Sequence, residues 1–175
     1  LKSGWAFKVI TNTENRGVGA AFNQGIQNSK YPYIVLVNND TWIMPSWDQA
    51  LLDADKRLNA DMLGAYFYEG PFDVAKTPIR AEKFVRRNKN SFSNEWASIL
   101  MFFRRSTFEK IGIFDERYFV SYEDRDLKER MERAQMKYYK IADCFIWHHS
   151  KGTRDAAQLR PRYEEESLAK FIEKW

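Results

Sequence analysis

Features of secreted, membrane-spanning and low-complexity proteins are scarce in this sequence. Its single cysteine, Cys144, excludes an internal disulfide bond, and the apolar run around it indicates an inert thiol in the core. No stretch approaches the roughly 20 apolar residues that cross a bilayer. The first five residues lack the charged and apolar regions of a signal peptide, and no repeat or low-complexity tract is present. We therefore expect a cytoplasmic protein without a transmembrane segment.

The composition is that of a protein with a substantial core. With 175 residues, of which 44% are hydrophobic and 16% aromatic, the chain fits one globular domain that spans residues 1–175. From residue 151 onward the sequence is a charged tail, with a final helix expected over residues 164–175.

The net charge of +4 is concentrated in one segment. Between residues 76 and 89, six bases stand against one acid, Glu82, a local excess of 6 − 1 = +5. The bases are Lys76, Arg80, Lys83, Arg86, Arg87 and Lys89. We favour a solvated loop, the usual meaning of such a run; the alternative is a rim that attracts a diphosphate, an acidic glycan or a lipid head group. No stacked aromatics interleave with the bases as in a single-strand binding groove, so we expect no nucleic-acid partner.

Hydrophobic periodicity predicts alternating strands and helices. Apolar runs predict strands at 6–10, 33–37, 62–68, 96–103 and 138–147. Helical spacing and start or stop signals predict helices at 15–29, from Ser46 to Leu58, at 106–111 before Gly112, and after Ser121, which has capping-box spacing to Asp124. Residues 70–93, which contain Gly70, Pro71 and Pro78, are expected to be irregular. The fold class is therefore α/β, and the unbroken 33–37 run favours a mostly parallel sheet flanked by helices.

Three polar clusters follow or flank these strands. Asn38-Asn39-Asp40 comes directly after the 33–37 run, Glu123-Asp124 precedes a helix, and His148-His149 follows the last strand. In alternating α/β sheets, ligands bind beyond the carboxyl ends of the strands. A carboxylate and an imidazole suit a divalent metal, which in turn suits a diphosphate. A further carboxylate away from the metal could act as a base.

Each cluster also has a plain structural explanation. Asp40 can end a strand through turn hydrogen bonds, and Glu123 with Asp124 can stabilise a helix amino terminus against its dipole. The histidines can be surface residues at a strand end. Taken singly, each of these explanations is the commoner one, but their joint occurrence at strand ends favours a site.

Four ordered blocks resemble glycosyltransferase family 2, especially its rhamnosyltransferase-like members. They are NRGVGAAFNQG at 15–25, YIVLVNNDT at 33–41, IGIFDERYFVSYEDRDL at 111–127 and IWHH at 146–149. Together they cover most of residues 8–150, which makes the resemblance more specific than any one motif.

The resemblance implies a GT-A fold that transfers a sugar from a nucleoside-diphosphate donor, with inversion at the anomeric carbon. Asp40 matches the metal-binding acid of the family's Asp-X-Asp motif, and His148 matches a histidine that completes the shell of Mn²⁺ or Mg²⁺ in some members. Asp124 matches the catalytic base, and Glu123 stands beside it at the catalytic centre.

The resemblance also implies roles for surrounding residues and for partners. Donor contacts are expected from Asn15, Arg16, Asn23, Asn38 and Asn39, and the acceptor side from Asp115 and Trp96. The acceptor would be a glycan, a lipid-linked sugar or a protein, as in polysaccharide biosynthesis, and peripheral membrane contact is compatible with this role.

The sequence departs from the family pattern at three points. Asn38 replaces the first acid of Asp-X-Asp, which predicts modest metal affinity. Gln135 stands where members often have glycine, at a cost of about 1 kcal/mol if its backbone is left-handed. The family also has two earlier strand and helix units, on the order of 60 residues, so we expect this chain to be an amino-terminally truncated fragment.

Two other functions are compatible with parts of the pattern. A non-catalytic module that binds sugar nucleotides or glycans is favoured by Asn38 and by the expected truncation. A related nucleotidyltransferase would need a glycine-rich phosphate loop near its start, and the sequence shows none.

Overall fold

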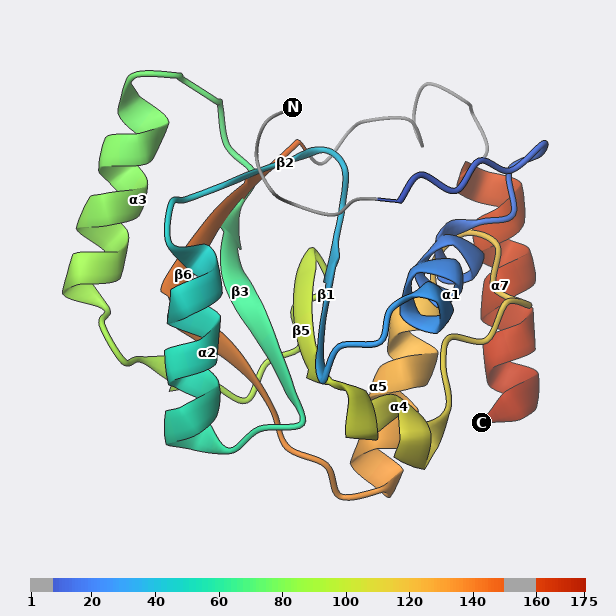
Figure 1. The fold of residues 1–175 in the computed structure, drawn as a ribbon. Coiled ribbons are helices and arrows are strands. Elements are labelled where there is room, and N and C mark those ends of the chain that lie inside the picture. The colour runs from blue at the N-terminus through green and yellow to red at the C-terminus, as the bar shows by residue number, and fades with distance from the viewer. Residues whose placement is uncertain (1–7, 150–159) are drawn as a thin grey trace.

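The computed structural model describes residues 8–149 and 160–175. A sheet of six strands stands between α2 and α3 on one side and α1, α4, α5 and α7 on the other (Figure 1). The strands are β1 (Tyr33–Val37), β2 (Thr41–Ile43), β3 (Met62–Tyr68), β4 (Phe92–Ser93), β5 (Leu100–Arg104) and β6 (Tyr138–His148). The helices are α1 (Val18–Asn28), α2 (Trp47–Leu58), α3 (Lys76–Arg87), α4 (Arg105–Ile111), α5 (Glu123–Arg133) and α7 (Arg160–Lys174).

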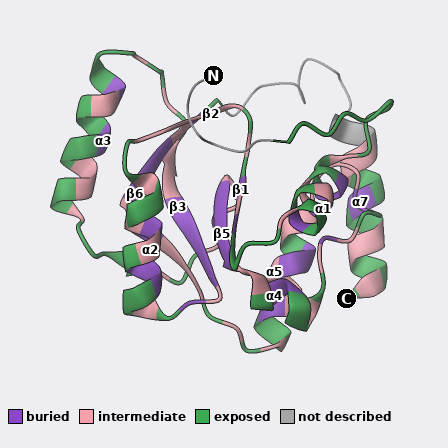
Figure 2. Cartoon of the chain, viewed as in Figure 1, coloured by how far each residue is buried: buried purple, intermediate pink, exposed green. Residues whose placement is uncertain are grey.

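Side-chain alternation along the strands builds one hydrophobic core on each face of the sheet. In β5, Met101 and Phe103 pack toward α1, α4 and α5, whereas Leu100 and Phe102 pack toward α2. Strands β3 and β5 are the most thoroughly buried part of the sheet (Figure 2). Cys144 lies in the second core, and burial raises the pKa of its thiol to about 12, which confirms the inert core thiol.

The sheet is mixed, and the expectation of a mostly parallel sheet was wrong. Its order is β1-β5-β3-β6-β2, with β4 also paired to β6. Among the described strands only β3 and β6 pair in parallel, since β5 runs antiparallel between β1 and β3, and β2 and β4 run antiparallel to β6. An apolar run records burial but not direction, so the sequence could not show that β5 inserts between two codirectional strands. Strand β1 is also less covered than expected, because Tyr33 and Val37 at its ends are exposed.

Most predicted elements are present, with shifted ends. The strand expected at 6–10 is absent over residues 8–10, and its first two residues lie outside the described part. The strand expected at 96–103 begins only at Leu100. Ser46 does occupy the residue before α2, but it makes no side-chain capping bond.

The capping box predicted for Ser121 and Asp124 does not form. Helix α5 begins at Glu123, and both Ser121 and Tyr122 have left-handed backbones, with φ of 64° and 70°. Ser121 therefore lies one residue too early to cap the helix. The backbone of Gln135 is left-handed, with φ of 53° after the end of α5, so the condition for a cost at this position is met.

Helix α3 occupies a segment that was expected to be irregular. The Asp73 carboxylate accepts hydrogen bonds from the backbone N–H groups of Ala75 and Lys76, at 2.9 and 3.0 Å, and so satisfies free donors at the helix start. Pro78 lies in the first turn, where a missing N–H costs nothing. Pro71 and Pro78 suggested a loop, but Asp73 followed by a first-turn proline is a helix start. Within the described residues, no helix combines the length and apolar character needed to cross a membrane.

Candidate active site

The pairing of β2 with β6 brings Asp40 and His148 together. Thr41 is the register partner of His148, and the His149 N–H donates to the Asp40 carbonyl at 2.9 Å. The His148 Nε2 atom consequently lies 3.3 Å from Asp40 Oδ1, and the imidazole is nearly buried. The antiparallel pairing of β2 with β6 thus brings together Asp40 and His148, which are 148 − 40 = 108 positions apart in the sequence.

Glu69, which the sequence reasoning did not identify, completes this arrangement. It follows the end of β3 directly, and its Oε1 atom lies 2.8 Å from His148 Nδ1. A neutral imidazole that donates Nδ1–H to Glu69 turns its Nε2 lone pair toward Asp40. The signal for Glu69 was available, because it is the first residue after an apolar strand, as Asn38 is after β1.

The turn that carries Asp40 is fixed by its backbone. The Asn38 N–H donates to the Ile99 carbonyl at 3.0 Å, and Thr41 Oγ1 donates to the Asn38 carbonyl at 2.8 Å. Within residues 8–149 and 160–175, the side chains of Asn38 and Asn39 make no hydrogen bond, and that of Asn39 is exposed. No other described residue therefore occupies their amide groups.

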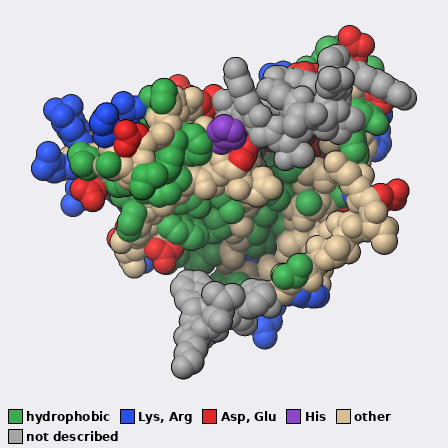
Figure 3. Space-filling model, turned by 90° about the horizontal axis from the view of Figure 1, so that it is seen from above, with side chains coloured by type: hydrophobic (Ala, Val, Ile, Leu, Met, Phe, Trp, Pro, Cys, Tyr) green, Lys and Arg blue, Asp and Glu red, His purple; other side chains and the backbone are tan. Residues whose placement is uncertain are grey.

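A recess of about 610 Å³ opens beside His148. Its lining comes from the segment after β3 and the end of β6, namely Glu69, Gly70, Pro71, Phe72, Trp147, His148 and His149. The rings of Phe72 and Trp147 are 4.6 Å apart, and Trp147 Nε1 donates to the Gly70 carbonyl at 2.7 Å, which fixes the indole. Figure 3 shows a histidine on this end of the molecule, next to hydrophobic side chains. The recess therefore offers aromatic faces beside the Glu69 carboxylate and the His148 imidazole.

Asp124 and Glu123 lie at the start of α5, the end of that helix nearest the carboxyl end of β1 in Figure 1. Asp124 Oδ1 accepts the backbone N–H of Arg125 at 2.8 Å, and its side chain is partly exposed. The helix dipole favours negative charge at this position. In the part of the chain that the structure describes, no group of three or more His, Cys, Asp or Glu side chains is arranged to hold a metal ion.

The residues expected to contact a donor do not all face outward. Asn23 is 1% exposed, and its amide bonds to both the N–H and the carbonyl of Phe114, each at 2.9 Å. It also donates to Glu116 Oε1. A direct donor contact by Asn23 is therefore wrong for this structure, because the amide is consumed in holding α1 to the 114–116 segment.

Asn15 and Arg16 are exposed and lie in the turn before α1. Asn15 Oδ1 accepts the Gly17 N–H at 2.9 Å, and Arg16 pairs with Glu116 at 2.9 Å. Gly17 has φ of 85°, and an added Cβ would lie 2.7 Å from the Phe119 carbonyl oxygen, so this turn packs against the segment that leads to Asp124.

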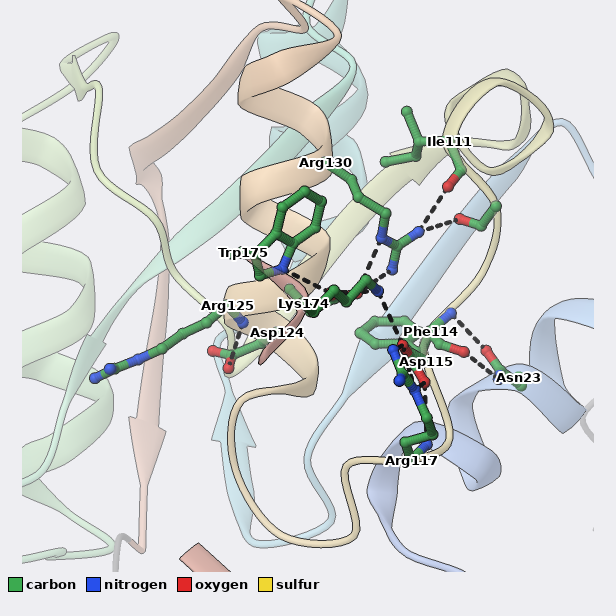
Figure 4. A network of polar contacts seen from close by, with 12 residues as sticks. Asn23, Ile111, Phe114, Asp115, Arg117, Asp124, Arg125, Arg130, Lys174 and Trp175 are labelled. Atoms are coloured by element: carbon green, nitrogen blue, oxygen red, sulfur yellow. Dashed lines mark hydrogen bonds and ion pairs between the residues drawn. The ribbon is translucent and has the colours of Figure 1, made fainter. Parts of the chain in front are cut away.

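Asp115 belongs to a charged network, shown in Figure 4, rather than to an open acceptor surface. Its carboxylate accepts hydrogen bonds from the Arg117 side chain and from Lys174 Nζ, the latter at 2.9 Å. The bond from Arg117 is the main reason that the pKa of this carboxyl lies well below its usual range, and Lys174 lowers it further. Lys174 also lies 2.6 Å from Asp126, which is fully buried.

The docking of α7 on α5 was not predicted. Trp175 Nε1 donates to Asp126 Oδ1 at 3.0 Å, and the Arg133 guanidinium lies 4.4 Å from the Trp175 ring centre. Arg130 pairs with Asp126 at 2.9 Å and donates to the Ile111 carbonyl. The network therefore ties the helix that carries Asp124 to both α4 and α7.

Trp96, also expected on the acceptor side, packs against the core cluster that includes Leu127 of α5, at the end of β6 far from His148, and its acceptor role stays a prediction. Its ring packs edge-on against Tyr138, with ring centres 5.4 Å apart. Tyr138 is the first residue of β6 and His148 the last, which are on the order of 30 Å apart in an extended strand.

Comparison with known proteins agrees with this architecture. The family model described as glycosyl transferase family 2 matches residues 1–128, which include Asp40 and Asp124. Uncharacterized proteins of Mycobacterium tuberculosis and Mycobacterium bovis are each 27% identical over 173 residues, or 97% of this chain and 62% of theirs. The chain thus spans less than two thirds of the length of these relatives.

The crystal structure of GalNAc-T7 with UDP, GalNAc and Mn²⁺ is similar in fold. The TM-score is 0.59 at 16% identity, over 78% of this chain and 31% of that one. This likeness confirms the GT-A fold expected from the sequence. Because the family model covers well over half of the chain, the protein belongs to glycosyl transferase family 2.

Proposed function

We propose that this chain forms part of a metal-dependent inverting glycosyltransferase that moves a sugar from a nucleoside diphosphate to an acceptor hydroxyl. The observation that carries the proposal is the meeting of Asp40 and His148 across β2 and β6, with Glu69 behind the imidazole. The finer assignment of a rhamnosyl-type donor is supported by the Asn38-Asn39-Asp40 form of the motif.

The donor set fits a divalent cation such as Mn²⁺ or Mg²⁺. Asp40 offers a carboxylate oxygen and His148 an imidazole nitrogen, both ordinary ligands of such ions. Glu69 orients the imidazole from its other nitrogen, as carboxylates behind metal-bound histidines commonly do. When bound, the cation supplies charge stabilisation for the departing diphosphate. Since two side chains leave most coordination positions open, affinity should rise when a diphosphate is present.

Asp124 is proposed as the base. In a single displacement, the bond from the acceptor oxygen to the anomeric carbon forms as the bond to the diphosphate oxygen breaks, and the acceptor proton must leave. The Asp124 carboxylate accepts that proton on the face of the sugar opposite the leaving group. It lies at the start of α5 with its side chain partly exposed, and Glu123 beside it shapes the same surface.

Donor contacts follow from exposure and from the position of the recess. The amides of Asn38 and Asn39, with Asn15 and Arg16, are proposed to face the donor. The aromatic recess at Phe72 and Trp147 is proposed to receive part of the donor, because it lies beside the proposed metal pair and apolar pockets with few polar groups are the usual ligand sites.

Calorimetry separates the assigned roles. UDP and dTDP are titrated into the chain with and without Mn²⁺, and the metal should strengthen binding of the preferred nucleotide. Asp40→Ala and His148→Ala should abolish the metal-dependent gain, whereas Asp124→Asn should retain it. Asp48→Ala, at an exposed acid in the first turn of α2, is the matched control.

Transfer of the sugar is then measured with the full-length protein. Asp124→Asn should lose transfer while still binding donor. Near-normal transfer by Asp124→Asn would exclude it as the base, and metal-independent nucleotide binding that is unaffected by Asp40→Ala would exclude the metal pair. Metal-dependent binding without any transfer or donor hydrolysis would instead support a non-catalytic module.

A further inference from the structure

Helix α3 contains most of the basic segment 76–89 and gathers several of its bases on one side of the helix. Thr77 and Ala81 are its buried residues. Positions spaced by four, three and four residues share one side of a helix. Lys76, Arg80, Lys83 and Arg87 are exposed and lie along one flank of the outer face, and Ile79 and Arg86 lie directly opposite the buried pair. One flank of the outer face of α3 is therefore a stripe of positive charge.

This charge is barely neutralised by the protein. Lys76 lies 3.6 Å from Asp73, and the Arg80 guanidinium lies 4.5 Å from the centre of the Tyr68 ring. Within residues 8–149 and 160–175, neither Lys83 nor Arg87 forms an ion pair. Among the described residues, Lys83 and Arg87 therefore carry charge that no acidic side chain offsets, and they can pair with an external anion.

Exposed apolar side chains lie beside the stripe. Ile79 is 64% exposed and shares the outer face with Lys83 one turn later. Val74, just before the helix, is 81% exposed, and Phe72 is 38% exposed. Single exposed hydrophobic residues are common, but three of them next to a basic helix face match the composition of helices that lie in a membrane interface.

We propose that the outer face of α3 and the 72–74 segment dock on an anionic lipid surface. The bases would contact lipid phosphates, and Val74 and Ile79 would enter the boundary of the acyl chains. An acidic glycan would pair with the bases but would leave both apolar side chains in water, so the lipid surface is favoured. In Figure 3, Lys and Arg side chains border the end of the molecule that carries a histidine, with hydrophobic side chains between them. Docking would thus hold the candidate site close to the membrane.

Vesicle sedimentation tests the proposal. The chain should bind vesicles of equal parts phosphatidylglycerol and phosphatidylcholine, should not bind pure phosphatidylcholine, and should be released as salt is raised. A base near an anionic membrane contributes about fivefold in affinity, so Lys83→Glu with Arg87→Glu should weaken binding by at least about 25-fold. Val74→Ser with Ile79→Ser should also weaken binding, with little change in its salt dependence.

Each double variant has a matched control. Lys30→Glu with Lys137→Glu makes the same charge change at exposed residues that precede β1 and β6, the opposite end of the sheet. Val9→Ser with Ile172→Ser makes the same apolar loss at residues that are 76% and 68% exposed. Both controls should bind vesicles as the unsubstituted chain does, and thermal melts check that every variant is folded.

Several results would overturn the proposal. These are equal binding to neutral and anionic vesicles, no binding to either, or equal losses in the controls. Binding to polygalacturonate that is lost in the Lys83/Arg87 variant, without binding to vesicles, would assign the face to an acidic glycan. Mn²⁺-dependent nucleotide binding is measured on the same variants and should be unchanged, so a failure of the proposed function and a failure of lipid docking are separate outcomes.

Discussion

Asp126→Asn removes the charge at the centre of the network that joins α5 to α7. The carboxylate is fully buried and lies 2.9 Å from Arg130, 2.6 Å from Lys174 and 3.0 Å from Trp175 Nε1. Breaking a buried ion pair costs about 3–5 kcal/mol, because the partner charge stays desolvated. The side chains of Arg130 and Lys174 are 16% and 24% exposed and can recover some hydration. We therefore expect the free energy of unfolding to fall by about 3 kcal/mol.

Urea denaturation measures this change. The midpoint should fall with little change in slope, and thermal melts should shift down by roughly 6–12 °C for a chain of this size. Asp53→Asn is the matched control, because its pair with Lys56 at 3.4 Å is more than half exposed on both sides and should contribute less than about 0.5 kcal/mol. If Asp126→Asn cost no more than Asp53→Asn at unchanged slope, the network would not stabilise the contact between α5 and α7.

Two further predictions concern pH and backbone strain. Arg117 and Lys174 lower the folded-state pKa of Asp115, so its charge stabilises the fold above its unfolded pKa of about 3.9, and this contribution is lost as pH falls toward the folded value. Asp115→Asn should therefore flatten the decline of the free energy of unfolding below about pH 4, measured by urea denaturation at several pH values. An unchanged decline below about pH 4 would contradict the assignment. Gln135 is exposed and has a left-handed backbone at φ 53°, so Gln135→Gly should raise the free energy of unfolding by about 1 kcal/mol. Gln27→Gly inside α1 should lower it. A lower free energy of unfolding in both variants would refute backbone strain at Gln135.

The sequence predicted the long buried strands, because their burial produces continuous apolar runs, but it missed the short strands β2 and β4. Residues 33–37 and 62–68 are β1 and β3 without adjustment. The order of strands is set by long-range packing instead. Nothing in residues 100–104 distinguishes a strand inserted antiparallel between β1 and β3 from one added in parallel at an edge. Helix α3 was missed for a local reason, since Pro78 was interpreted as a breaker and the Asp73 helix start was overlooked.

The candidate site was predicted where its residues follow strands and missed where contacts cross between layers. Asp40 and His148 were expected together and lie together, and Glu69 obeys the same strand-end rule. Asn23 appears in a family block yet is buried, so a motif position did not distinguish ligand contact from packing. Lys174 and Trp175 carried no signal, because their partners Asp115 and Asp126 are defined only by the docking of α7.

The two halves of the candidate site are positioned by different physical means. Asp40 and His148 are fixed by a strand register next to Ile146, which is fully buried, so their spacing should resist changes in the helices. Asp124 has no such register and takes its place from α5, which is held by the buried Asp126 two residues later and through it by Lys174 and Trp175. Loosening of α7 should therefore displace the proposed base while leaving the proposed metal pair intact. For that reason, a variant such as Lys174→Met should impair transfer by the full-length protein more than it impairs Mn²⁺-dependent nucleotide binding, although neither Lys174 nor α7 contacts the metal pair.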